Sequence, residues 1–344
     1  MQDILSLTQD ELTQLIKSYD HPAYRAKQIY AWLHKNMISS YDEMTNIPKA
    51  LRHTLAEQYY IPSPTTIKHL VSTDESEKFL FSFGKDVIIE TVLMKSKYGY
   101  TICVSTQVGC KMACTFCASH RNGWAQDLTT GQILAQVYTI QKRLDKKISN
   151  IVIMGIGEPL DNYDASIRFI RTVSSEEGLN LSQRNITIST CGIVPKMLDL
   201  ANEGLSVTLA VSIHAGTNCV RRQIMPITDT YNIEEILSAA QNYFEKTHRR
   251  ISYEYALIKD VNDTKEQAKA LADKLKGTPS HVNLIPLNPV SESGYLTAEG
   301  ATLKAFAKII DDAGISVTVR VSRGQDINAA CGQLRLANTQ NNAE

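Results

Sequence analysis

Short apolar runs alternate with segments of helical periodicity from residue 128 onward. The runs are almost continuously apolar, as in strands buried on both faces, and this alternation is typical of βα units that form a parallel sheet. The expected strands are 150–156, 184–190, 206–213, 251–258, 281–287 and 316–321, and the expected helices are 129–143, 194–202, 233–245, 264–275 and 298–312. About six such units, fewer than the eight of a closed barrel, predict an α/β fold built on a partial (β/α)6 barrel.

The chain before this region has two other patterns. Residues 66–104 contain short runs typical of a β-meander, whereas the first sixty residues have helical periodicity. The expected strands are 78–83, 87–94 and 100–105, and the expected helices are 8–18, 23–36 and a third after Pro48. The prolines of Ile61-Pro62-Ser63-Pro64 mark a boundary, because they end a helix and favour an extended link.

These patterns divide the chain into four expected segments. A small helical accessory domain at 1–62 precedes a β-rich linker at 63–95 and the core barrel at 96–324. A C-terminal loop with Cys331 and a frayed tail at 338–344 make up the last segment, 325–344.

Basic and aromatic residues are interleaved in the expected N-terminal domain. They are Arg25, Lys27, Lys35, Lys49 and Arg52, together with Tyr24, Tyr30 and Trp32. This mixture is what a small RNA-contacting module presents, although an ordinary solvated helix face has the same composition.

Composition limits the class of protein. Of 344 residues 43% are hydrophobic and 21% charged, which excludes a disordered or fibrous chain. Lys+Arg 36 balance Asp+Glu 36, so a nucleic-acid partner would have to meet a local basic patch. The start has no basic segment followed by an apolar one, and no run reaches the length of a membrane helix, so we expect a cytoplasmic protein with no membrane partner.

Three of the seven cysteines lie within eight residues and indicate a metal site. Cys110, Cys114 and Cys117 form a Cys-x3-Cys-x2-Cys motif in a loop after an expected strand. A structural zinc ion needs four ligands, which a remote cysteine or His120 could complete. Three thiolates from one loop suit an iron–sulfur cluster with one open iron better. This spacing, with Phe116 before the third cysteine, resembles the radical S-adenosylmethionine superfamily.

A wider resemblance covers nearly the whole chain. Gly155-Ile156-Gly157-Glu158-Pro159 follows an expected strand and is similar to the superfamily's Gly-Gly-Glu-Pro element. With Cys331 included, the chain resembles the RlmN/Cfr family of radical S-adenosylmethionine RNA methyltransferases. The segments that carry the resemblance are 90–94, 103–110, 154–160, 188–192, 212–215, 222–226, 249–255, 281–286 and 326–335. Within the family the chain looks closer to the adenine-C2 branch, which acts on 23S ribosomal RNA and in some bacteria on transfer RNA, than to the C8 branch linked to antibiotic resistance.

The resemblance implies two cofactors and the residues that hold them. Cys110, Cys114 and Cys117 would bind a 4Fe-4S cluster. Two molecules of S-adenosylmethionine would be used per turnover, and the residues implied to bind this cofactor are Gly157, Glu158, Ser189, Ser212, Ile213, His214 and Asn288.

The resemblance also implies a mechanism, because carbon 2 of adenine is too electrophilic to take a methyl group directly from a sulfonium. Cys331 would first be methylated, and a radical formed on its methyl group would add to the base. Glu90 would accept the proton, and Cys103 would release the product by forming a disulfide with Cys331. A flavodoxin or ferredoxin-type electron donor and a thiol reductant would then be partners. Cys191 and Cys219 are given no role beyond packing or an unreactive surface position.

The loop after the cysteines departs from the family pattern. Most relatives have Arg-Asn-Leu before the next helix, whereas this chain has Gln126-Asp127-Leu128, with His120 and Arg121 earlier in the loop. His120 is interpreted as a loop residue and not as an extra ligand. Three alternatives therefore stay open: a Cfr-like C8 methyltransferase, action on another RNA, and a non-catalytic zinc-dependent RNA-binding protein.

Overall fold

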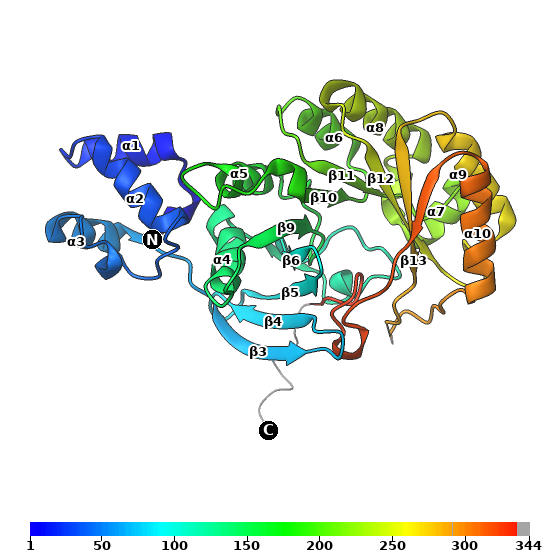
Figure 1. The fold of residues 1–344 in the computed structure, drawn as a ribbon, viewed down its shortest axis with the longest axis horizontal. Helices are drawn as coiled ribbons and strands as arrows, with labels where there is room; N and C mark the ends of the chain where they lie inside the picture. The colour runs from blue at the N-terminus through cyan, green and yellow to red at the C-terminus, as the bar shows by residue number, and fades with distance from the viewer. Residues whose placement is uncertain (291, 336–344) are drawn as a thin grey trace.

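The computed structural model describes residues 1–290 and 292–335, so the tail expected at 338–344 lies outside the described residues. Its centre is a curved ten-stranded sheet in the order β14-β13-β12-β11-β10-β9-β6-β5-β4-β3 (Figure 1). The strands are β3 (Thr65–Val71), β4 (Glu77–Ser82), β5 (Ile88–Ser96), β6 (Gly99–Cys103), β9 (Ile148–Ile153), β10 (Ile186–Thr190), β11 (Thr208–Ser212), β12 (Ile251–Leu257), β13 (Ser280–Pro286) and β14 (Ser316–Val319).

The sheet is parallel from β6 to β14 and antiparallel from β3 to β6. Helical connections lie between the successive parallel strands: α4 (Thr130–Gln141), α5 (Tyr163–Ser174), α6 (Val194–Ala201), α7 (Asn218–Ile224) with α8 (Ile233–Thr247), α9 (Lys265–Leu275) and α10 (Gly300–Asp312). Six crossovers and an open sheet confirm the expected partial (β/α)6 barrel. The antiparallel strands β3, β4 and β5 extend it on one side.

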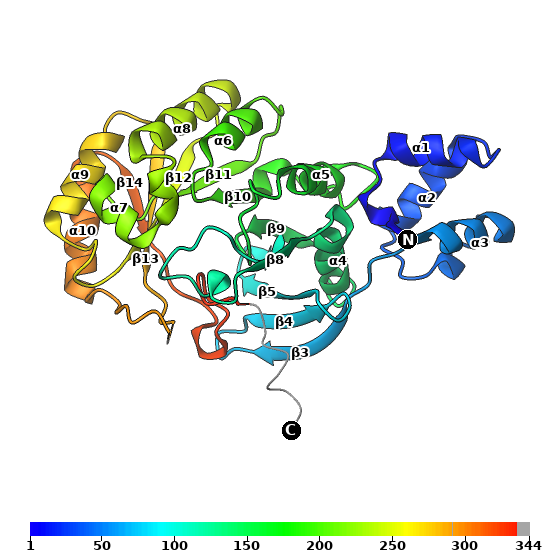
Figure 2. The same ribbon diagram turned by 180° about the vertical axis from the view of Figure 1, so that it is seen from behind.

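The strands form because their residues are apolar and β-branched where both faces are covered. Ile151, Ile188, Leu209 and Val211 are fully buried in the hydrophobic core. The C-terminal loop, coloured red, lies beside β4 (Figure 2), where Lys78 donates a hydrogen bond to the Asn328 carbonyl at 3.0 Å.

Some elements were not expected from the sequence. Helix α5 buries Ile167, Ile170 and Val173 at helical spacing, although the sequence analysis assigned no element there. A hairpin of β7 (Gln107–Gly109) and β8 (Trp124–Asp127) encloses the cysteine loop. These two strands are too short and polar for a clear period-2 pattern.

The N-terminal unit lies to one side of the barrel (Figure 1). It contains α1 (Gln9–Ser18), α2 (Tyr24–His34) and α3 (Lys49–Gln58), and the short strands β1 (Gln2–Asp3) and β2 (Tyr59–Tyr60) pair in parallel. The three helices lie where the sequence predicts them. Thr8 begins α1 with a capping box to Glu11, which also pairs with Arg168 of α5. None of the helices in the described part of the chain is long and apolar enough to cross a membrane.

Candidate functional site

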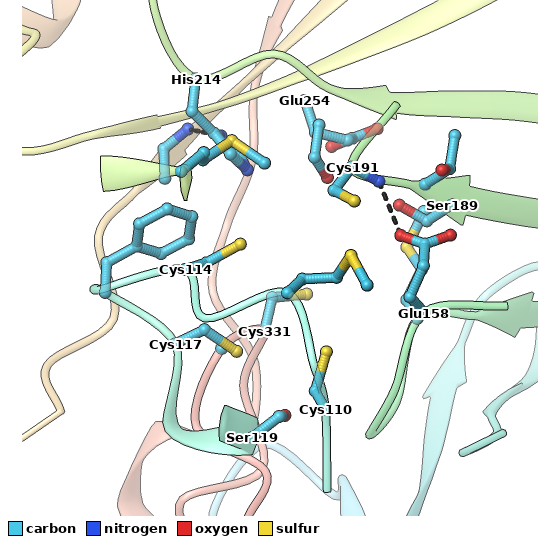
Figure 3. Close-up of a pocket in the computed structure, with 18 of the residues that line it drawn as sticks. Cys110, Cys114, Cys117, Ser119, Glu158, Ser189, Cys191, His214, Glu254 and Cys331 are labelled. Atoms are coloured by element: carbon cyan, nitrogen blue, oxygen red, sulfur yellow. Dashed lines mark hydrogen bonds between the residues drawn. The ribbon is translucent and has the colours of Figure 1, made fainter. Parts of the chain in front are cut away.

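A pocket lies at the carboxyl ends of the parallel strands, between the cysteine loop and the C-terminal loop (Figure 3). Open α/β sheets and barrels bind ligands at this end, because loops from several strands meet there. Of the residues singled out from the sequence, the pocket is lined by Cys110, Cys114, Cys117, Gly157, Glu158, Ser189, Ser212, His214, Asn288 and Cys331. Residues far apart in the chain are thus brought to one cavity.

The three cysteines of the motif face a common space in this pocket (Figure 3). All three are free and partly exposed. The loop is shaped by a turn from Cys117 N–H to the Cys114 carbonyl (3.0 Å) and by a left-handed Ala113. It is fixed to α7 because Thr115 N–H donates to the Ile224 carbonyl at 3.0 Å.

The arrangement of the cysteines fits an iron–sulfur cluster. Burial, together with the neighbouring Cys117, raises the pKa of the Cys110 thiol to about 12, so an added positive group is needed to hold it as a thiolate. Among the described residues, no three metal-binding side chains lie close enough together to hold a single metal ion. A cluster instead places each thiolate on a different iron, which suits ligands that line a pocket.

Glu158 is held rigidly in the pocket wall. Its carboxylate accepts hydrogen bonds from the Cys191 N–H at 2.7 Å and the Leu160 N–H at 3.0 Å, and burial raises its pKa. Gly157 before it has φ +108, and a Cβ there would lie 2.7 Å from the Gln107 Cβ. The turn after β9 therefore requires glycine at this position.

His214 is a neutral donor at the end of β11. Its Nδ1 accepts the Ala256 N–H at 2.9 Å, and burial lowers its pKa to about 3, so the proton is on Nε2. The ring meets Phe116 edge-on, with 4.9 Å between the ring centroids. The cysteine loop and the β11 loop are thereby packed together.

Ile213 does not present its side chain to the pocket. It is fully buried in the hydrophobic core. Its N–H donates to the Glu254 carbonyl at 3.1 Å, and its carbonyl accepts from Arg221 Nε at 3.1 Å. Its main-chain groups are therefore already bonded within the protein.

Cys103 and Cys331 line one cavity that adjoins the first. Cys103 packs in an apolar cluster with Ala329 and Leu334 of the C-terminal loop, and Cys331 lines both cavities. Both thiols are free, and burial raises the pKa of each. Cys103 is buried, whereas Cys331 is exposed.

The loop that carries Cys331 is tied to the cysteine loop and to the barrel. Ala118 N–H donates to the Gly332 carbonyl at 2.7 Å, and Ser119 Oγ donates to the Leu334 carbonyl at 2.8 Å. Asn288, which follows β13, donates to the Cys331 carbonyl at 2.9 Å. The loop therefore closes over the mouth of the barrel.

Glu90 lies at the edge of this region and lines neither cavity. It is buried, pairs with Lys78 at 3.0 Å, and accepts the Arg335 N–H at 2.9 Å. Val92 lies on the same face of β5 and is the cross-strand partner of Cys103. Glu90 is thus close to the Cys103 side of the second cavity.

Three polar residues that support the site were not identified from the sequence. Gln107 accepts the Glu158 N–H at 2.8 Å, Glu254 lines the pocket, and Arg221 bonds the carbonyls of Cys191, Ser212 and Ile213. No motif marks them, because each acts through contacts between distant segments.

The unusual loop after the cysteines is part of this support. Asp127 accepts from Gln107 Nε2 at 2.7 Å and from Trp124 Nε1 at 3.0 Å. His120 does not line the pocket, and its Nε2 is buried without a hydrogen-bond partner. Cys219 is exposed, whereas Cys191 is buried and lines the pocket, a position that the sequence analysis did not assign to it.

Comparisons with known proteins agree with this geometry. The Radical SAM superfamily model matches residues 104–273, and the model of the Ribosomal RNA large subunit methyltransferase N-terminal domain matches residues 2–61. A "Probable dual-specificity RNA methyltransferase RlmN" of Clostridium botulinum (strain Eklund 17B / Type B) is 49% identical over 97% of this chain and 96% of its own length.

Two further proteins extend the comparison. The protein of the same name from Clostridium novyi (strain NT) is 46% identical over 99% of this chain and 100% of its own. The crystal structure of a radical SAM methyltransferase from Sphaerobacter thermophilus superposes with a TM-score of 0.94 at 40% identity, covering 98% of this chain and 100% of that one.

Proposed function

Because this chain belongs to the RlmN family of radical S-adenosylmethionine RNA methyltransferases, we propose that it methylates carbon 2 of an adenosine in 23S ribosomal RNA. Transfer RNA is proposed as a second substrate, in line with the dual specificity named for its relatives. The observation that carries the proposal is the pair Cys103 and Cys331 in one cavity beside the cysteine loop. A methyl-carrying thiol and a second thiol that releases it need this proximity.

The residues of the first pocket are proposed to hold the cofactors. Cys110, Cys114 and Cys117 would bind a 4Fe-4S cluster. The proposed contacts of S-adenosylmethionine are Gly157, Glu158, Ser189, Ser212, Ile213, His214 and Asn288. Because the side chain of Ile213 is buried and its N–H and carbonyl are bonded within the protein, its proposed contribution is van der Waals contact of its main chain. When bound, the cluster supplies one electron, and two molecules of S-adenosylmethionine per turnover supply the methyl group and a carbon radical.

Cys331 is the proposed methyl carrier. Its thiol loses a proton and gains a methyl group, and the carbon of that group then forms the new bond to adenine. The hydrogen bond from Asn288 holds the Cys331 main chain where the two cavities meet. The carrier can then serve the cofactor on one side and RNA on the other without a long movement.

Glu90 and Cys103 are proposed to complete the reaction. After the radical adduct has lost one electron, Glu90 takes the proton from carbon 2 of the base. The Cys103 thiol gives up its proton, and its sulfur bonds the Cys331 sulfur while the bond from that sulfur to the product carbon breaks. The released carbon takes up a proton to become the methyl group, and a disulfide is left for an external thiol to reduce. For Glu90 to act, the Arg335 N–H and the Lys78 ammonium must leave part of its carboxylate free.

The N-terminal unit is a proposed RNA contact. Family membership makes RNA the substrate, and the matched N-terminal model covers the segment rich in basic and aromatic residues. Arg25 already donates to the Asn46 carbonyl, which fixes its side chain on the surface. A flavodoxin or ferredoxin-type protein is proposed as the electron donor.

The test is anaerobic incubation of the reconstituted protein with S-adenosylmethionine, a reductant and unmodified ribosomal RNA, followed by nucleoside mass spectrometry. We expect 2-methyladenosine, lost in Cys331→Ala and retained in Cys219→Ala, whose thiol is exposed and outside both cavities. Unchanged turnover in Glu90→Gln would assign the base elsewhere. A parallel reaction with transfer RNA tests the second substrate.

The same experiment separates the alternatives. 8-Methyladenosine would keep the carrier chemistry and place the chain with the C8 branch. A colourless protein with bound zinc would support the non-catalytic RNA-binding alternative, which the family membership disfavours.

A further inference from the structure

Arg221 is a fully buried arginine of α7 and one of the largest fully buried side chains among the described residues. Its Nε donates to the Ile213 carbonyl at 3.1 Å and its Nη1 to the Thr228 hydroxyl at 2.9 Å. Its Nη2 donates to the carbonyls of Cys191 and Ser212. All four acceptors are electrically neutral.

Among the described residues, no carboxylate lies within ion-pairing distance of this buried charge. None of the ion pairs formed by residues 1–290 and 292–335 includes Arg221. Its neighbour Arg222 is exposed and pairs with Asp229, as a surface arginine ordinarily does. A buried guanidinium stays charged and is costly to bury without a counter-charge, so a missing anion is expected nearby.

The cysteine loop is the neighbouring segment that can supply this anion. Arg221 donates a hydrogen bond to the carbonyl of Cys191. Cys191 belongs to an apolar cluster with Ile224, and Cys114 packs against that cluster. The loop is also bonded to the end of α7 through Thr115 and Ile224.

We propose that Arg221 is the built-in counter-charge of the iron–sulfur cluster and that it raises the reduction potential of that cluster. Three thiolates outweigh the positive charge of the oxidised core, so the cluster is an anion, and the one electron that it accepts adds a further negative charge. A fixed cation beside it stabilises the reduced form more than the oxidised form. This inference rests on the cluster of the proposed function and is independent of the RNA substrate.

The test is a redox titration of the reconstituted cluster by electron paramagnetic resonance, with dithionite as the one-electron reductant and without S-adenosylmethionine or RNA. In Arg221→Gln, the ratio of reduced to oxidised cluster at the wild-type midpoint should fall about tenfold, equivalent to a midpoint lower by about 59 mV. Arg221→Lys, which keeps the charge, and Arg222→Met, which removes an exposed charge, should stay near the wild-type midpoint.

The other outcomes also decide the proposal. An intact cluster with an unchanged midpoint in Arg221→Gln overturns it, and weakened S-adenosylmethionine binding in that case would assign the charge to the cofactor's carboxylate. If Arg221→Gln cannot hold a cluster, retention in Arg221→Lys supports the proposal, whereas equal loss in both variants reduces Arg221 to a packing residue. None of these results depends on methylation, so the proposed function can fail or stand separately.

Discussion

The side-chain amide of Asn288 donates a hydrogen bond to the main-chain carbonyl of Cys331 at 2.9 Å. The oxygen of the same amide accepts a hydrogen bond from Gln325 at 2.7 Å. One residue at the end of β13 therefore fixes two points of the C-terminal loop. The Cys331 thiol is thus positioned by a residue that follows a rigid strand, whereas a loop alone would leave its position variable.

Asn288→Ala should slow methylation of Cys331 by about 100-fold, because a displacement of about 1 Å in a reacting group has an effect of this size. The measurement is the rate of mass gain of the intact protein in a single turnover. Asn202→Ala, which removes an exposed amide bonded to the Leu198 carbonyl, is the matched control and should react normally. Equal rates in both variants would contradict the positioning role.

Cys103→Ala should stop the reaction after the base has bonded to the carrier, because no second thiol is then available to attack the Cys331 sulfur. We expect RNA to remain attached to the protein on a denaturing gel, and the attachment to require Cys331. Free methylated RNA from this variant at the normal rate would remove Cys103 from the mechanism.

Gly157→Ala should reduce stability by about 1–3 kcal/mol and weaken binding of S-adenosylmethionine. The added Cβ would meet Gln107 at 2.7 Å and shift the turn that holds Glu158. Gly84→Ala is a control, since φ is +130 there and no atom lies within 4 Å of the added Cβ. Thermal unfolding and calorimetric titration should show a binding defect in Gly157→Ala alone.

His34 should make the protein less stable in acid. Burial lowers its pKa from 6.5 to about 3, and its Nδ1 lies 2.9 Å from the Tyr138 hydroxyl, between the N-terminal unit and α4. Below pH 6.5 His34 is protonated in the unfolded chain but stays neutral in the folded chain. The free energy of unfolding therefore falls as the pH falls towards 3.

The slope due to this histidine is about 1.4 kcal/mol per pH unit. Urea unfolding of wild type and His34→Gln at pH 7, 6 and 5 measures it, and the variant should lose the smaller amount of stability on acidification. Parallel pH profiles for the two proteins would show that His34 is not the group responsible.

The parts of the fold that the sequence predicts well are those with a strong period. The parallel strands and most of their helices lie close to their expected ranges. An apolar run such as that of β9 predicts a strand because its side chains have to be buried between the sheet and the helices that cover it. The hairpin β7–β8 and the pairing of β1 with β2 depend on contacts between segments, and no local pattern marks them.

The candidate site shows the same division. Cys110, Cys114 and Cys117 are marked by their spacing, and Glu158 by the glycines before it. Arg221 had no such mark, because in the sequence it is one of two adjacent arginines, and only the folded chain distinguishes the buried residue from the exposed one. The engagement of Glu90 by Lys78 and Arg335 likewise joins residues from three separate segments.

The C-terminal loop is bonded to segments made much earlier in synthesis. Asp326 accepts from Ser72 across 254 positions, and Leu334 accepts from Ser119 across 215. During translation, the barrel strands and the cysteine loop are therefore made before Cys331, the proposed carrier thiol. Under the proposed function, such a chain could bind its cofactors while still being synthesised, but it could not begin methyl transfer until residues 324–335 had emerged and folded back.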